Sequence, residues 1–484
     1  MVSMIELKNI SVDLDGNHLF NIERLLVNEG DNVFIIGDNG VGKSTLLNVI
    51  TGLVPISKNG YLQNDFDFSY LKQKNEKNHF EYNSEIDYRL MNELNVPSNQ
   101  VGLSGGELKK INITESISMY KECLILDEPT THLDKTSVDI LAKELKYYYG
   151  TILCVSHSRD FINELATKIW EISDGAVKEY IGNYDDYLEQ KELEKISLQN
   201  EYKAYTIKKE ELVQSIAQQR AYAESLKKKN TKDTNNPGRL GQSKPKDVVA
   251  KNAFKKLKDL EGKLERMKEV DQVEDKVPII FPTSKLVDIH NKIPIYSQDY
   301  TLVKGNKILL ENASFQFPYG KKISIVGENG VGKTSFLSDI INRNQQIEIS
   351  SKIVVSAYNQ MDYEIKSDKN ILSYLQEHSD YNVDFLEHVL LKLRFTRNDF
   401  RKIVSNLSGG EITRLKLALT FIKPSNTIIL DEPTNFLDIS VIQSLEELVR
   451  SYRGLIIYTS HDEEFVRQTA DIIFKISNRK LIEV

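Results

Sequence analysis

The stretch Gly-Asp-Asn-Gly-Val-Gly-Lys-Ser-Thr at residues 37–45 decides the fold, and it recurs as Gly-Glu-Asn-Gly-Val-Gly-Lys-Thr-Ser at residues 327–335. Both copies fit G-x-x-x-x-G-K-[ST], and each follows a short apolar run and precedes a run compatible with a helix. Glycines let the main chain wrap a phosphate so that its amide hydrogens point inward at a helix N-terminus. The sequence therefore predicts two phosphate-binding loops, each between a strand and a helix of an α/β fold.

Further motifs follow each loop in the same order. Leu-Ser-Gly-Gly-Glu at residues 103–107 recurs at 407–411, Asp-Glu-Pro-Thr at 127–130 recurs at 431–434, and Ser-His at 156–157 recurs at 460–461. These copies are offset by 304 residues, whereas the two glycine-rich loops are offset by 290. Such self-similarity indicates two copies of one domain, the first of which is shorter between its loop and Leu103.

The polar residues of the two loops are suited to a nucleotide with its metal ion. We expect Lys43 and Lys333 to reach the β- and γ-phosphates and the hydroxyls of Ser44 and Thr334 to coordinate Mg²⁺. The loop residues expected to contact ATP are Gly37, Asn39, Gly40, Gly42, Lys43, Ser44, Thr45, Gly327, Asn329, Gly330, Gly332, Lys333, Thr334 and Ser335.

A pair of carboxylates follows an apolar strand in each half, after residues 123–126 and 427–430. The carboxyl edge of an open α/β sheet is where such folds bind ligands. We expect Asp127 and Asp431 to hold the metal, and Glu128 and Glu432 to orient and deprotonate the attacking water. The alternative is ordinary strand-end charge, which the upstream phosphate loops disfavour.

Composition excludes several other classes of protein. The 484 residues are 40% hydrophobic and 27% charged with a net charge of −7, the balance of an ordinary globular protein rather than a basic nucleic-acid coat. Two cysteines, Cys123 and Cys154, rule out a disulfide framework and a Cys-based zinc site, and both lie in apolar runs typical of a core. No apolar run approaches the roughly 20 residues of a membrane span, and the first residues lack a signal peptide. We therefore expect a cytoplasmic protein without membrane contact.

Residues 189–276 differ in pattern from the two copies. Apolar residues at spacings of three and four predict two amphipathic helices that pair as an antiparallel hairpin, the first about 40 residues and roughly 60 Å long, with the turn at 230–246. The predicted division is a first domain at 1–188, a linker at 189–277 and a second domain at 278–484. Within 227–258, eleven Lys and Arg against two Asp give +9 and leave −16 elsewhere. This suits insertion among phosphates, although a lysine-rich helix can also be simply solvated.

The set of motifs resembles the ATP-binding cassette (ABC) ATPases. In that family two domains clamp two ATP molecules, and the Leu-Ser-Gly-Gly signature of one domain completes the site of the other. The resemblance implies that the signature of the second domain contacts the ATP on Lys43, and that of the first contacts the ATP on Lys333. The signature residues concerned are Ser408, Gly409 and Gly410 in the second domain, and Ser104, Gly105 and Gly106 in the first.

The same resemblance assigns two further pairs of residues. Gln73 and Gln360 match the glutamine loop of the family, which implies that they lie near the metal and the attacking water. His157 and His461 match the switch histidine, which implies that they donate to the γ-phosphate. A histidine after a strand is more often structural, but its recurrence in both copies favours the functional interpretation.

Tyr-Ile-Gly-Asn-Tyr-Asp-Asp-Tyr at residues 180–187 leads directly into the predicted hairpin and resembles the motif before the linker of the F subfamily (ABC-F). The implied fold class is α/β, with two P-loop ABC nucleotide-binding domains joined by a long α-helical hairpin. The implied partner is the ribosome, entered at the tRNA exit site, where residues 227–258 reach ribosomal RNA and tRNA near the peptidyl-transferase centre. We expect a monomer whose two domains pair within the chain, and ATP and Mg²⁺ as its ligands.

The interval between Gln73 and the signature spans 31 residues, against 48 in the second copy. It has no room for the arm that housekeeping ABC-F members insert there, so the chain resembles the antibiotic-resistance, ribosome-protecting branch. We expect a linker tip around 235–246 that displaces a drug bound at the peptidyl-transferase centre, with hydrolysis driving release. The alternatives are a housekeeping translation factor that relieves stalled ribosomes, the ATPase subunit of an ABC transporter, and a DNA-repair ATPase, which usually has far longer coiled coils and a zinc hook.

Overall fold

The computed structural model describes residues 3–14, 16–56, 60–72, 86–96, 105–131, 133–232, 244–270, 279–282, 291–305, 307–359, 365–435 and 437–484. The chain folds into two compact units. The first consists of Met1–Tyr187 together with Pro278–Val484, and the second of Leu188–Val277. Among the described residues, none of the helices has the length and apolar character needed to cross a membrane.

The first half of the chain builds one nine-stranded sheet in the order β4-β1-β2-β9-β8-β3-β7-β6-β5. Its strands are β1 (Met4–Leu14), β2 (Asn17–Asn28), β3 (Asn32–Gly37), β4 (Tyr61–Asn64), β5 (Phe68–Leu71), β6 (Cys123–Asp127), β7 (Thr151–Val155), β8 (Lys168–Ser173) and β9 (Ala176–Ile181). Its helices are α1 (Lys43–Ile50), α2 (Tyr88–Glu93), α3 (Gly105–Ser118), α4 (Lys135–Lys146) and α5 (Arg159–Leu165).

The second half repeats this plan over two sheets, in the orders β11-β10-β13 and β14-β15-β16-β12-β17-β18. Its strands are β10 (Ile295–Lys304), β11 (Lys307–Phe317), β12 (Lys322–Val326), β13 (Glu348–Ile349), β14 (Val355–Tyr358), β15 (Thr427–Asp431), β16 (Leu455–Thr459), β17 (Ile472–Ser477) and β18 (Lys480–Glu483). Its helices are α8 (Lys333–Ile341), α9 (Ile371–Glu377), α10 (Val383–Lys392), the short 3₁₀ turns η3 (Asp399–Arg401) and η4 (Val404–Asn406), α11 (Gly409–Ile422), α12 (Ile439–Ser451) and α13 (Glu463–Thr469).

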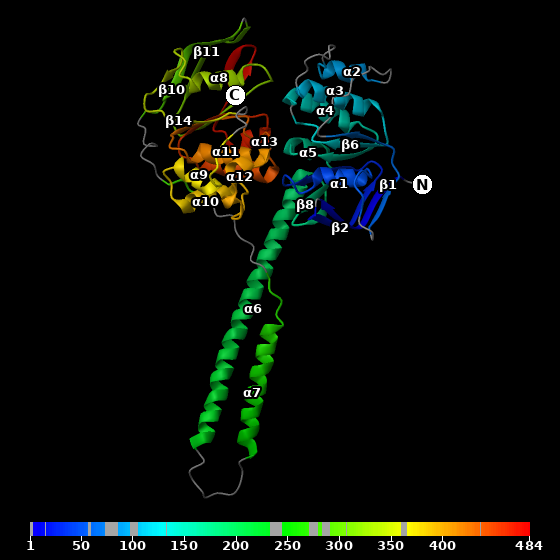
Figure 1. The fold of residues 1–484 in the computed structure, drawn as a ribbon, viewed down its shortest axis with the longest axis vertical. Coiled ribbons are helices and arrows are strands. Elements are labelled where there is room, and N and C mark those ends of the chain that lie inside the picture. Colours follow the sequence, from blue (N-terminus) through cyan, green and yellow to red (C-terminus); the bar gives the residue numbers. More distant parts are fainter. Residues whose placement is uncertain are drawn as a thin grey trace. The chain divides into compact units, whose positions relative to one another are not determined.

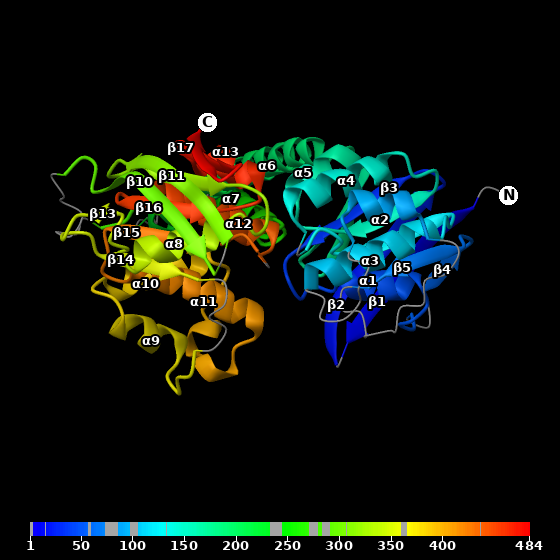
Figure 2. The ribbon, with the colours of Figure 1, turned by 90° about the horizontal axis from the view of Figure 1, so that it is seen from above.

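The shared centre of both halves is a parallel sheet, β5-β6-β7-β3-β8 in the first and β14-β15-β16-β12-β17 in the second. In β3, Val33 and Ile35 face a core with α1 and the β1-β2 pair, whereas Phe34 and Ile36 face a core with α3, α4 and α5. In the second half α8 packs on β15 and β16 (Figure 2). Because helices cover both faces, the central strands are buried throughout, as the continuous apolar runs of the sequence predict.

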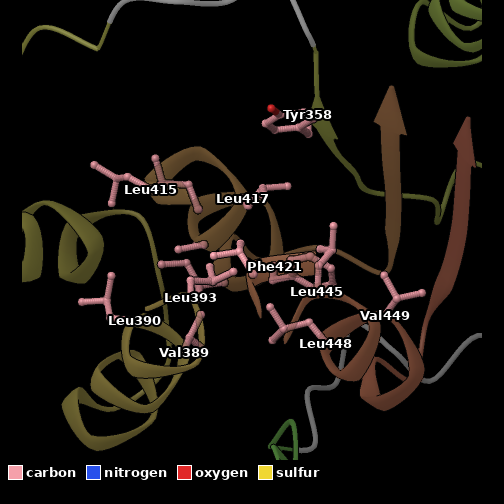
Figure 3. Close-up of a cluster of buried hydrophobic side chains, with 14 of the residues drawn as sticks. Tyr358, Val389, Leu390, Leu393, Leu415, Leu417, Phe421, Leu445, Leu448 and Val449 are labelled. Carbon is pink, nitrogen blue, oxygen red and sulfur yellow. The ribbon is translucent and has the colours of Figure 1, made fainter. Parts of the chain in front are cut away.

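The largest core of the second half lies where three helices meet. Side chains of α10, α11 and α12 converge there, with Tyr358 of β14 nearby (Figure 3). Leu390, Leu417 and Leu445 are fully buried in it. The helices α9 and α10 occupy the interval that is shorter in the first half, where the described residues hold α2. The length difference found in the sequence is therefore a difference in helical content beside the sheet.

In the described part of the segment between the halves, the helices α6 (Tyr184–Lys232) and α7 (Lys244–Glu265) run side by side (Figure 1). At 49 residues, α6 is longer than the predicted 40 because it begins within the tyrosine motif. Ala223, Ala253 and Leu257 are buried in the seam, and Arg220 pairs with Glu261 at 2.6 Å across it. The predicted hairpin is thus confirmed for the described residues.

The predicted turn at 230–246 is too wide, because residues 230–232 still belong to α6 and residues 244–246 already belong to α7. Lys232, Lys244 and Lys246 are good helix formers, and Pro245 is tolerated because it lies in the first turn of its helix. The rest of the predicted tip, residues 233–243, lies outside the described residues.

Candidate nucleotide-binding sites

Each glycine-rich loop joins a central strand to a helix, β3 to α1 and β12 to α8. Gly42 caps α1 with φ +102°, and a Cβ atom there would lie 2.8 Å from the ring of Phe20. Gly37, with φ +151°, passes so close to the carbonyl oxygen of Ile172 that a Cβ would lie 2.6 Å from it. Only glycine fits these positions, which explains the spacing that identified the loop.

The loop lysines are buried and turned onto their own loops. Lys43 Nζ donates to the carbonyl oxygens of Gly37 at 2.9 Å and Asp38 at 3.0 Å. Lys333 Nζ donates to Gly327 at 2.8 Å and also lies 3.0 Å from Nε2 of His461. Burial lowers the pKa of both lysines, and the carboxylates of the adjoining strand oppose this. A cation is thus fixed at the N-terminus of each loop helix, where phosphates bind.

The predicted metal ligands of each half come together. A hydrogen bond from the Ser44 hydroxyl stabilises the charged form of Asp127, and Thr334 Oγ1 donates to Asp431 Oδ1 at 3.2 Å. Asp127 Oδ1 is buried without a hydrogen-bond partner among the described residues. A hydroxyl beside a carboxylate with an unused oxygen is a donor set that Mg²⁺ accepts, so these residues fit the expected ion.

The second carboxylate of each pair is buried beside the switch histidine. His157 Nε2 lies 3.1 Å from Glu128 Oε1, and His461 Nε2 lies 3.2 Å from Glu432 Oε1. Burial raises the pKa of Glu128, against the effect of Lys43, and raises the pKa of Glu432 to about 7. A carboxylate whose pKa approaches the working pH is suited to accept a proton from water.

Both histidines are neutral. Burial, with help from the nearby Lys43 ammonium, lowers the pKa of His157 to about 3. Burial and Lys333 lower the pKa of His461 to about 4. A neutral imidazole can donate one hydrogen bond and accept another, which fits the contact of His461 with the Lys333 ammonium.

The signature glycines begin helices in both halves. Gly105 and Gly106 open α3, while Gly409 and Gly410 open α11. Ser408 caps α11 in a capping box, in which its hydroxyl accepts from the main-chain NH of Glu411 and the Glu411 carboxylate accepts from the main-chain NH of Ser408. The main-chain amides at the N-termini of α3 and α11, together with the helix dipoles, are suited to bind a phosphate. Ser104, Gln73 and Gln360 lie outside the described residues.

Contacts between the two halves link the loops to residues that the sequence did not single out for the site. The main-chain NH of Asn39 donates to Asp438 Oδ2 at 3.2 Å, and Ser440 Oγ donates to Asp38 Oδ1 at 2.6 Å. The charge of Asp134 in turn acts on Lys333. The signal was available, because Asp134 and Asp438 follow the two Asp-Glu-Pro-Thr motifs at the same spacing.

Comparisons with known proteins agree with this geometry. The family described as ABC transporter matches residues 21–99 and 310–435. The chain is 37% identical over 485 residues to the erythromycin resistance ATP-binding protein MsrA of Staphylococcus epidermidis, covering 99% of both. It is 29% identical to the ribosome protection protein VmlR of Bacillus subtilis (strain 168), covering 99% of this chain and 87% of that protein.

A solved structure shares the fold. The RNase-L inhibitor superposes with a TM-score of 0.66 at 16% identity, over 97% of this chain and 87% of that one. The predicted fold class is confirmed, as is the resemblance on which it was based. With two phosphate loops, two carboxylate pairs and a relative similar from end to end, the chain is an ATPase that belongs to the ABC-F subfamily of ATP-binding cassette proteins, in the antibiotic-resistance branch.

Proposed function

We propose that this ATPase protects the ribosome from antibiotics. In this proposal it binds the ribosomal exit site, and the tip of its linker displaces a drug from the peptidyl-transferase centre. The observation that carries the proposal is similarity over 99% of the chain, linker included, to a protein named for erythromycin resistance. The ribosome protection protein VmlR, similar over the same span, supports the ribosome as partner.

The proposed division of labour follows the chain: cassettes at 1–188 and 278–484, and the linker at 189–277 as the part that reaches RNA. Residues 227–258 carry the net charge of +9 that suits a partner built of phosphates. We place the protein in the cytoplasm, acting as a monomer. Asp438 and Ser440 of the second cassette contact the loop of the first, which supports pairing of the cassettes within one chain.

Within each site the chain supplies binding, orientation and a base. The loop amides and Lys43 or Lys333 hold the phosphates of ATP, and bound Mg²⁺ supplies charge neutralisation at the transferring phosphate. Glu128 or Glu432 accepts a proton from the attacking water. The neutral histidine lies within 3.2 Å of that carboxylate and donates to the γ-phosphate. ATP binding stabilises the closed pair of cassettes, and hydrolysis removes this stabilisation and releases the ribosome.

A co-sedimentation experiment tests the ribosome as partner. The double variant Glu128→Gln/Glu432→Gln binds ATP but lacks both bases, so we expect it to pellet with ribosomes only when ATP is present. The matched control is Glu23→Gln/Glu348→Gln, which changes one exposed glutamate in each half and should behave as the unmodified chain. Equal recovery in the supernatant with and without ATP would falsify the ribosome as partner.

Growth assays separate resistance from a housekeeping role. Expression in a drug-sensitive host should raise the inhibitory concentration of at least one peptidyl-transferase inhibitor, and the double glutamine variant should not. If ribosome binding is found but no inhibitor changes in potency, the housekeeping translation factor becomes the better description. Recovery with membranes and not with ribosomes would instead favour the transporter subunit.

A further inference from the structure

The two ATP sites hold their catalytic carboxylates by different means. In the second cassette Thr459 Oγ1 donates to Asp431 Oδ1 at 2.8 Å and accepts from the main-chain NH of Glu432 at 2.9 Å. One hydroxyl thus fixes both residues of the Asp-Glu pair. This matters because Glu432 has φ +48°, a left-handed conformation that a non-glycine residue keeps only when its surroundings hold it.

The first cassette lacks this hydroxyl, because Val155 occupies the position of Thr459, 304 residues earlier. Glu128 has the same left-handed conformation, with φ +52°, and its main-chain NH donates to the carbonyl oxygen of Val155 at 2.9 Å. Nothing from β7 reaches the Asp127 carboxylate, whose Oδ1 has no hydrogen-bond partner among the described residues. Apart from the hydrogen bond of the Ser44 hydroxyl to Asp127, the first site therefore needs support from another element.

A buried lysine supplies it. Lys109 of α3 is 8% exposed, and its Nζ donates to the carbonyl oxygen of Asp127 at 3.3 Å, one peptide before Glu128. The charges of Asp127 and Glu128 act on the Lys109 ammonium and favour its charged form. The equivalent residue of the second cassette is Thr413, whose hydroxyl instead donates to Gly409 of its own helix at 3.0 Å. The pair Lys109 and Val155 of the first cassette thus corresponds to the pair Thr413 and Thr459 of the second.

We infer that Lys109 is a positioning residue of the first ATP site, which holds the Asp127-Glu128 turn in place of the hydroxyl that Thr459 provides in the second. Lys109 lies on the helix that opens with the signature of the first cassette, the segment proposed to contact the ATP held by Lys333. The orientation of Glu128 is therefore tied to the position of α3, whereas Glu432 is fixed from β16. The two sites are unequal, and the first responds to events at the second.

The inference rests on the site assignment proposed above, but its test needs no ribosome. ATP hydrolysis is measured on the full purified chain in a Glu432→Gln background, so that turnover reports the first site. Lys109→Met keeps the buried stem and removes the charge; we expect kcat to fall at least tenfold while nucleotide affinity, measured by equilibrium binding with Mg²⁺, changes less than twofold. The control is Lys146→Thr, an exposed lysine of α4, which should leave both unchanged.

Exchanging the residue pairs of the two cassettes, Lys109 with Val155 and Thr413 with Thr459, gives the decisive result. Lys109→Thr/Val155→Thr installs the chemistry of the second cassette and should restore kcat to within about threefold. In a Glu128→Gln background, Thr459→Val should lower kcat of the second site, and Thr413→Lys added to it should restore turnover. Wild-type kcat in Lys109→Met, or a loss that neither exchange recovers in chains with unchanged thermal midpoints, would overturn the inference. If the Lys109 variants do not fold, the comparison of Thr459→Val with Thr459→Val/Thr413→Lys tests the inference by itself.

Discussion

At the residue scale, the buried charge of each loop lysine has specific partners close by. Lys43 and Lys333 are buried against loop carbonyls and face the carboxylates at the strand ends. His157 and His461 are buried without charge, because burial and a neighbouring ammonium both disfavour the imidazolium. The chemistry of each site thus depends on a neutral histidine between a cation and a carboxylate.

The histidines predict how stability depends on pH. For His461 the pKa is about 4 in the folded chain and about 6.5 unfolded, so the unfolded chain binds more protons between these values and stability falls as pH falls through this window. Between pH 6.5 and 5 this costs on the order of 1.5 kcal/mol. Urea unfolding should show a smaller pH dependence in His461→Gln. The exposed His18→Gln serves as control, and an unchanged dependence in His461→Gln would contradict the buried neutral imidazole.

At the element scale, small residues let α6 and α7 approach each other. Ala223 is fully buried and Ala253 is 5% exposed, while Gln219 Nε2 donates to the carbonyl oxygen of Ala253 at 3.1 Å. A side chain reaching a main-chain oxygen on the other helix requires a close approach, which alanine permits. The narrow apolar seam of the sequence therefore predicts pairing, but the closeness depends on two methyl groups.

Replacing one of the two seam alanines by a larger residue should weaken the packing of α6 against α7. Ala223→Leu inserts a large side chain where no space exists, which typically costs about 1–3 kcal/mol. Hydrogen exchange of amides in the seam should accelerate by about 5- to 150-fold, with exchange in the cassettes unchanged. Glu224→Leu places the same side chain on the exposed neighbouring position and should leave exchange close to that of the unmodified chain. Equal effects of the two substitutions would mean that the seam is not tightly packed.

At the scale of the whole molecule, a buried ion network joins the cassettes just after the switch histidines. Arg159 Nη2 donates to Glu446 Oε1 at 2.7 Å and lies 3.3 Å from the carboxylate of Asp462. Arg159 is 6% exposed and Glu446 is 4% exposed. Tyr184, in the first turn of α6, is close enough for both charges to act on its hydroxyl. The segments that follow His157 and His461 are thereby tied to one point of contact.

Removing one partner of this network should cost more than removing both. Arg159→Met leaves Glu446 buried without its cation, for which we expect a loss of about 3–5 kcal/mol, whereas Arg159→Met/Glu446→Leu should recover most of it. Arg450→Met removes the exposed second cation of Glu446, 3.8 Å away, and should cost less than about 1 kcal/mol. Chemical unfolding of the unmodified chain, Arg159→Met, Glu446→Leu and Arg159→Met/Glu446→Leu completes the cycle. Additive losses would show that the two side chains are not coupled in solution.

The sequence by itself determined the features that short stretches encode. Glycine spacing identified both phosphate loops because φ values near +100° and closely packed neighbouring side chains restrict Gly42 and Gly332. Apolar runs that end in Asp-Glu identified the central strands and the carboxylates, and the repeat showed two copies of one domain. These signals are local, so no knowledge of the fold was needed to read them.

Only the tertiary structure decided which residues, distant along the chain, form ion pairs or hydrogen bonds with each other. Lys109 looks like part of a lysine-rich helix start, yet the fold places it against the strand that ends in Asp127. Arg159 and Glu446 are 287 residues apart and meet at the contact between cassettes. Burial turns such meetings into strong interactions by removing water, and neither burial nor the partner can be inferred from the spacing along the chain.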